Sequence, residues 1–115
     1  MRFGEILTEA KQQLIEDNNA DQVICAVLSS GAVKFCCNHS VFSGDHSDED
    51  SFIKQLAASD PEKIRTMICL WRNSQLDLPS VYFRRRIREL NLLDIGADIL
   101  LQGTNGPKLI RFPDI

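Results

Sequence analysis

Hydrophobic residues recur at helical spacing in three segments of the chain. In the first segment, apolar residues stand three, four, seven and eleven positions after Phe3, which predicts a helix over residues 4–17. A second helix is expected over residues 47–58, where three acidic residues in the first turn suit the positive end of the helix dipole. Pro79 favours the first turn of a third helix, which we expect to end near Leu90.

Five further segments are rich in β-branched and apolar residues, which is typical of strands. They are QVICAVLSS (22–30), AVKFCCN (32–38), IRTMICLW (64–71), ADILLQGT (97–104) and KLIRF (108–112). The first has no regular polar alternation, as expected of a strand buried on both faces. The dipeptide NG at residues 105 and 106 predicts a tight turn between the last two.

The order of these elements is α-β-β-α-β-α-β-β, with helices placed between strands. This order predicts one α/β domain over residues 1–115, in which about five strands form a mixed sheet with helices on both faces. The resulting architecture is a three-layer sandwich.

Charge and composition restrict the possible partners. The formal net charge of −3 gives no general attraction to nucleic acid, so we do not expect nucleic acid to be the partner. No apolar run approaches the ~20 residues of a membrane-spanning helix, and the first residues lack the apolar core of a signal peptide. We therefore expect a cytoplasmic protein that does not enter membranes.

The four cysteines do not form a pattern typical of a metal site. Cys25, Cys36, Cys37 and Cys69 all fall in predicted strands, where a reduced cysteine behaves as a small hydrophobic residue. Adjacent residues of a strand point to opposite faces, so Cys36 and Cys37 are not placed to bind one ion together. We interpret all four as structural thiols.

The segments FSGDHSDEDSF (42–52) and LPSVYFR (78–84) open the second and third helices. The layout of the chain resembles the cytidine deaminase superfamily, in particular its free-nucleoside branch, in which a helix and a hairpin precede two motif helices. In that family, a zinc ion held by one His or Cys and two Cys activates a water molecule, and a glutamate transfers protons.

The resemblance implies roles for individual residues. His46 stands at the position of the first zinc ligand, and Asp48 at that of the proton-transferring glutamate. The two cysteine ligands are replaced by Ser80 and Phe83, which leaves fewer than the three protein ligands that catalytic zinc needs. Asn38 corresponds to a nucleoside-contacting asparagine. We therefore expect His46 and Asp48 to be vestigial catalytic positions in a pseudoenzyme without a cofactor.

Two alternative interpretations involve the binding of a metal ion or of an anionic ligand. His39, His46, Asp45 and Asp48 could supply a replacement site, with zinc serving a divergent nucleoside or nucleobase deaminase; we favour an ordinary acidic helix start. The arginines between residues 84 and 88 could bind nucleotides or RNA, although most are expected on the solvent side of an amphipathic helix.

The favoured interpretation is a non-catalytic protein that binds a ligand or a protein partner, or that oligomerises. A dimer or tetramer is expected because the family commonly assembles through its motif helices, and the small ligand would be nucleoside-like. Trp71, which ends a predicted strand, is interpreted as a core or interface aromatic residue. The candidate binding residues are Asn38, Ser80, Tyr82, Arg84 and Arg85.

Overall fold

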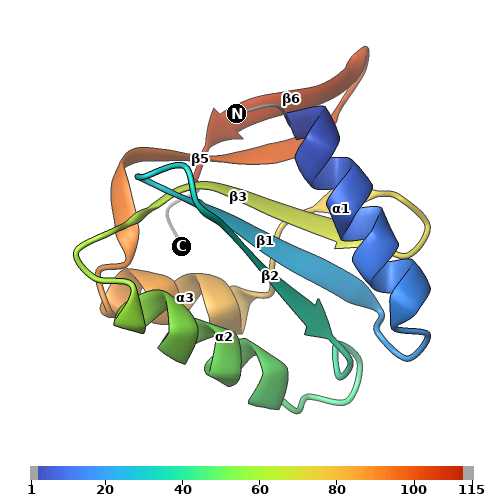
Figure 1. Cartoon of the computed structure of the whole chain (residues 1–115), viewed down its shortest axis with the longest axis horizontal. Coiled ribbons are helices and arrows are strands. Elements are labelled where there is room, and N and C mark those ends of the chain that lie inside the picture. The colour runs from blue at the N-terminus through green and yellow to red at the C-terminus, as the bar shows by residue number, and fades with distance from the viewer. Residues whose placement is uncertain (1–2, 113–115) are drawn as a thin grey trace.

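The computed structural model describes residues 3–112 and contains the predicted elements in the predicted order (Figure 1). They are α1 (Phe3–Glu16), β1 (Gln22–Leu28), β2 (Val33–Asn38), α2 (Ser47–Ala58), β3 (Ile64–Trp71), β4 (Leu76–Asp77), α3 (Val81–Glu89), β5 (Leu93–Gly103) and β6 (Gly106–Arg111). The two-residue strand β4 was not predicted, because it is too short to produce a pattern of its own.

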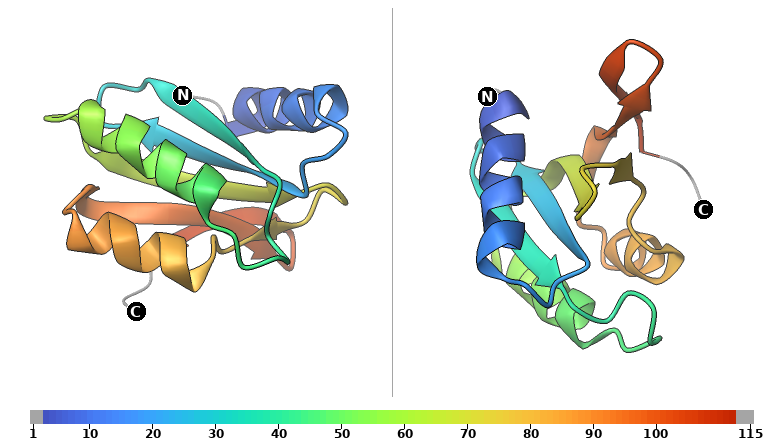
Figure 2. Two further views of the ribbon diagram at one scale, coloured as in Figure 1. Left: turned by 90° about the horizontal axis from the view of Figure 1, so that it is seen from below. Right: turned by 90° about the vertical axis from the view of Figure 1, so that its right-hand side faces the viewer.

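The strands form one mixed sheet in the order β2-β1-β3-β5-β6, and β4 pairs with β3. Only the β3–β5 pair is parallel among the pairs in the described part of the chain. Helix α1 covers one face of the sheet, whereas α2 and α3 lie side by side on the other (Figures 1 and 2). This arrangement confirms the predicted three-layer α/β sandwich. No helix within residues 3–112 is long and apolar enough to cross a membrane.

Each face of the sheet carries its own hydrophobic core. Every residue of β1 is buried, which confirms that this strand is covered on both sides. Its alternate side chains enter different cores: Cys25 packs on the side of α1, and Ile24 packs on the side of α2 and α3. Cys36 and Cys37 likewise contact opposite cores, as the strand alternation predicted.

The last hairpin departs from its predicted boundaries. Strand β5 begins at Leu93, four residues before the predicted start, and its pairing with β3 shifts register near a Gly96 that has φ of +76°. In this segment Leu93 and Ile95 are separated by Asp94 and followed by Gly96, so it lacks the continuous apolar run expected of a buried strand. The turn comprises residues 104 and 105, whereas Gly106 pairs with Gly103 and begins β6. The predicted turn was therefore displaced by one residue.

Candidate functional site

The first turns of α2 and α3 meet through a buried carboxylate. Oε1 of Glu49 lies 2.8 Å from Nδ1 of His46, and Oε2 accepts a hydrogen bond of 2.5 Å from the hydroxyl of Ser80. The Ser80 hydroxyl also accepts a hydrogen bond from the Phe83 backbone N–H, and so caps α3. The Glu49 side chain is only 4% exposed. A carboxylate at this depth depends on its hydrogen-bonding partners.

Tyr82 completes this contact between the helices. Its ring stacks on His46 with centroids 3.9 Å apart, and its hydroxyl donates a hydrogen bond of 2.6 Å to Asp50. The hydrogen bond to the Asp50 carboxylate raises the pKa of Tyr82. We refer to His46, Glu49, Ser80 and Tyr82 as the interhelical cluster.

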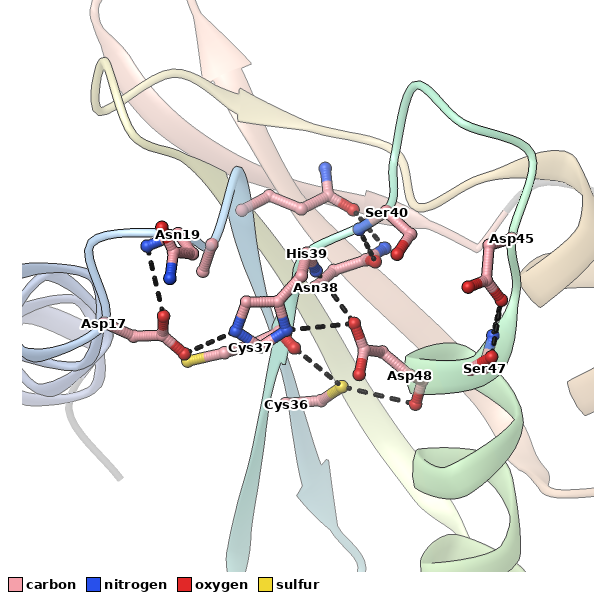
Figure 3. A network of polar contacts seen from close by, with 12 residues as sticks. Asp17, Asn19, Cys36, Cys37, Asn38, His39, Ser40, Asp45, Ser47 and Asp48 are labelled. Atoms are coloured by element: carbon pink, nitrogen blue, oxygen red, sulfur yellow. Dashed lines mark hydrogen bonds and ion pairs between the residues drawn. The ribbon is translucent and has the colours of Figure 1, made fainter.

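His39 forms a second polar centre at the end of β2 (Figure 3). Its Nε2 lies 2.5 Å from Asp17, directly after α1, and its Nδ1 lies 3.0 Å from Asp48 in the first turn of α2. The same Asp48 oxygen accepts a hydrogen bond from the His39 backbone N–H. The hydrogen bonds to Asp17 and then Asp48 raise the pKa of His39, and the bond from His39 lowers the pKa of Asp17. We call these three residues the His39 bridge.

The two predicted catalytic positions therefore belong to different centres. His46 contacts Glu49 and Tyr82, whereas the Asp48 carboxylate accepts hydrogen bonds from His39. Asp45, the remaining acidic candidate, accepts a hydrogen bond of 2.9 Å from the Ser47 backbone N–H. Sequence reasoning missed Glu49, although its spacing of three residues from His46 in a helix is a signal of contact.

Asn38 lies at the end of β2 with its side chain buried (Figure 3). The side-chain NH₂ group donates a hydrogen bond of 3.3 Å to the side chain of Gln22. The side-chain oxygen Oδ1 accepts a hydrogen bond of 3.3 Å from the Ser40 backbone N–H. These contacts hold the amide against β1 and the following loop. The predicted nucleoside-contacting residue is thus engaged within the chain.

The arginines of α3 occupy different environments. Arg85 is exposed, as predicted for the solvent side of an amphipathic helix. Arg84 is buried, and its Nε atom has no hydrogen-bond partner within residues 3–112. Arg84 is the exception to the expectation that most of these arginines face solvent, because the buried face of α3 includes Phe83, Arg84 and Ile87.

Within residues 3–112, no group of three or more His, Cys, Asp or Glu side chains is arranged to hold a metal ion. His39 and Asp48, two of the weak metal candidates, do lie together, but the third, His46, contacts Glu49. All four cysteines are free thiols. Burial raises the pKa of each, that of Cys36 to about 12, so these thiols resist ionisation.

The His39 bridge predicts a pH-dependent stability. The pKa of His39 is higher in the folded chain than its unfolded value of 6.5. Its contribution to stability is therefore complete below pH 6.5 and is lost as the pH rises through the folded pKa. The lowered pKa of Asp17 adds stability above its unfolded value of 3.8, which is lost as pH falls through the folded pKa. We expect the difference in melting temperature between the wild type and His39→Gln to be largest between pH 3.8 and pH 6.5.

Thermal unfolding followed by circular dichroism from pH 3 to 9 measures this difference. The His39→Gln variant keeps a polar amide but cannot become charged, so it is the matched control. A difference in melting temperature that stays constant across the range, or that grows above pH 7, would contradict the bridge.

No protein-family model matches the chain, and no curated protein sequence matches it. Solved structures do match its fold. Cytidine deaminase from Mycobacterium leprae aligns with a TM-score of 0.64 at 13% identity, covering 95% of this chain and 93% of that one. Cytidine deaminase from Mycobacterium tuberculosis aligns with a TM-score of 0.60 at 13% identity, covering 94% and 89%. The chain therefore has a cytidine deaminase-like fold over nearly its whole length.

Proposed function

We propose that this deaminase-fold protein is non-catalytic, holds no zinc, and acts by binding a ligand or a protein partner. The observation that supports this proposal is the Glu49 carboxylate between His46 and Ser80. By the resemblance, these last two residues stand where the first two zinc ligands are expected. A hydrogen-bonded link within the chain joins them instead.

The donor atoms at the three expected ligand positions do not fit zinc. Only the imidazole of His46 is a good zinc ligand, and one protein ligand is fewer than the three of a catalytic site. The Ser80 hydroxyl already donates to Glu49 and caps α3. Phe83 at the third position is fully buried and stacks on Phe52 with ring centroids 6.1 Å apart. This position has become part of the hydrophobic core.

The position of the proton-transferring group supports the same proposal. Asp48 is one methylene shorter than glutamate, which withdraws the carboxylate by roughly 1 Å where catalysis depends on positioning at that scale. One of its oxygens accepts hydrogen bonds from both the backbone and the side chain of His39. This carboxylate therefore has a structural role in joining β2 to α2.

Untagged protein is expected to contain far less than one zinc ion per chain and to release no ammonia from cytidine, deoxycytidine, adenosine or guanine. Elemental analysis and an ammonia assay measure these two results, and His46→Ala is the control for any metal found. Stoichiometric zinc that is lost in His46→Ala would overturn the proposal in favour of a divergent deaminase with an unusual metal site.

Formation of homo-oligomers, whether dimers or tetramers, stays a prediction, as does binding of a nucleoside-like ligand. Two apolar side chains on α3 or directly after it, Val81 and Leu90, are more than 40% exposed, and this supports self-association through that helix.

A further inference from the structure

An open groove lies where β3 ends and where the loop after β2 approaches it. A cavity of about 520 Å³ is lined by Phe42, Trp71, Asn73, Gln75, Leu76 and Asp77. A second cavity of about 270 Å³ shares the first three of these residues and adds Asp21 and Arg72. We call the two together the Trp71 groove. No residue of the interhelical cluster lines it.

Two aromatic rings form one wall of the Trp71 groove. The ring of Phe42 stacks on Trp71, with centroids 5.7 Å apart and planes at 23°. The indole N–H of Trp71 donates a hydrogen bond of 2.9 Å to Asp77, which fixes the orientation of the ring. Phe42 is 81% exposed, an unusual position for so large an apolar side chain. The Trp71 ring is therefore held in place, and the Phe42 ring beside it is open to a ligand.

The charge of the groove is negative. Asp77 lines the larger cavity and Asp21 the smaller one. Arg72 is the basic residue in their described lining, but its guanidinium donates hydrogen bonds of 2.6 to 3.0 Å to the main-chain carbonyls of Leu14, Asp17 and Ala20. That positive charge is directed to the C-terminal end of α1. The groove thus combines aromatic faces with two carboxylates.

We propose that the Trp71 groove binds a small organic cation that carries an ammonium group. A cation is attracted to the negative face of an aromatic ring, most strongly to tryptophan, and a nearby carboxylate adds to this attraction. Phosphate-bearing ligands are disfavoured by Asp21 and Asp77. A neutral ligand would gain contact area but nothing from the two carboxylates. The charge of the groove therefore selects the ammonium ion.

This inference goes beyond the proposed function and does not depend on it. The groove and the interhelical cluster share no residue, so zinc content and ammonium binding are separate measurements. Finding zinc at His46 would leave the groove as it is. A failure to bind ammonium ions would leave the evidence on zinc unchanged.

Trp71 is the only tryptophan of the chain, so its fluorescence reports directly on the groove. Choline supplies a quaternary ammonium ion, and 3,3-dimethyl-1-butanol has the same shape without the charge. We expect choline to change the fluorescence saturably and to bind at least about fivefold more tightly than the neutral alcohol, the ratio expected of a cation–π contact of about 1 kcal/mol.

Variants separate the contributions of the aromatic face and of the charge. Phe42→Leu keeps an apolar side chain but removes the π-face, and Asp21→Asn keeps the shape of the side chain and removes its charge. Asp77 is left unchanged, because its two oxygens accept hydrogen bonds from the Trp71 indole and the Leu78 backbone N–H. We expect each change to weaken choline binding severalfold, with little effect on the neutral alcohol. Ile95→Ala is the control, because Ile95 is 99% exposed and lines a different cavity.

Circular dichroism of each variant checks that it remains folded. The proposal is overturned if the wild type shows no saturable response to choline, or if choline and the neutral alcohol bind equally. It is also overturned if folded Phe42→Leu and Asp21→Asn both bind choline as tightly as Ile95→Ala does.

Discussion

Replacing Phe83 with alanine is expected to lower the free energy of unfolding by about 3–5 kcal/mol, the usual cost of truncating a buried phenylalanine. The side chain of Phe83 is fully buried and stacks on Phe52 of α2. The ring therefore fills the space between the two helices that carry the interhelical cluster. Urea unfolding followed by circular dichroism measures the change in free energy.

Glu89→Ala is the control, because Glu89 lies on the same helix and its side chain is 65% exposed. Its effect is expected within about 0.5 kcal/mol. Phe83→Cys tests the link to function, since it introduces a thiol at an expected ligand position. We expect this variant to be strongly destabilised with or without added zinc. A loss below 1 kcal/mol for Phe83→Ala, or recovery of Phe83→Cys by zinc, would contradict a core role.

The main elements of the fold could be predicted because most of them carry apolar residues at regular helical or strand spacing. Helix α2 and strand β3 have the predicted bounds, since apolar spacing and turn residues agree at both ends. Strand β5 was predicted less well. Its first residues include the fully exposed Ile95 and pass through a left-handed glycine at Gly96, so they belong to the strand by pairing with β3 rather than by a buried apolar pattern.

The candidate site was predicted in part, and the geometry of a helix explains the difference. Successive residues of an α-helix are rotated by about 100°, so the residue three positions after His46 lies on the same side, whereas the residue two positions after it does not. Glu49 therefore contacts His46, and Asp48 is directed toward β2 and His39. A motif read by its spacing alone places His46 and Asp48 in one site.

The distant partners of both centres could not be found in the local pattern. Ser80 lies 31 residues from Glu49, and Asp17 lies 22 residues from His39. Only the packing of α1, α2 and α3 on the sheet brings these pairs together. The exposed ring of Phe42 beside Trp71 is another such contact, since one residue lies in a loop and the other ends β3.

Removing His46 is expected to destabilise the protein more than removing Glu49, although the two residues share one contact. His46→Ala leaves the buried Glu49 carboxylate with Ser80 as its remaining partner, and an underpaired buried charge costs about 2–3 kcal/mol or more. Glu49→Leu removes the charge itself, and replacing a buried ionic group by an apolar one costs about 1 kcal/mol or less. Urea unfolding of both variants measures the two losses.

A double-mutant cycle then isolates the contact. In the Glu49→Leu background, His46→Ala has no carboxylate to leave underpaired, so its cost should fall by about 1–2 kcal/mol relative to the wild-type background. Gln55→Ala on the exposed side of α2 is the control, with an effect within about 0.5 kcal/mol in either background. Additive losses would mean that Glu49 does not hold His46. The imidazole would then be free to bind a metal ion, and the argument for a non-catalytic protein would lose the contact on which it rests.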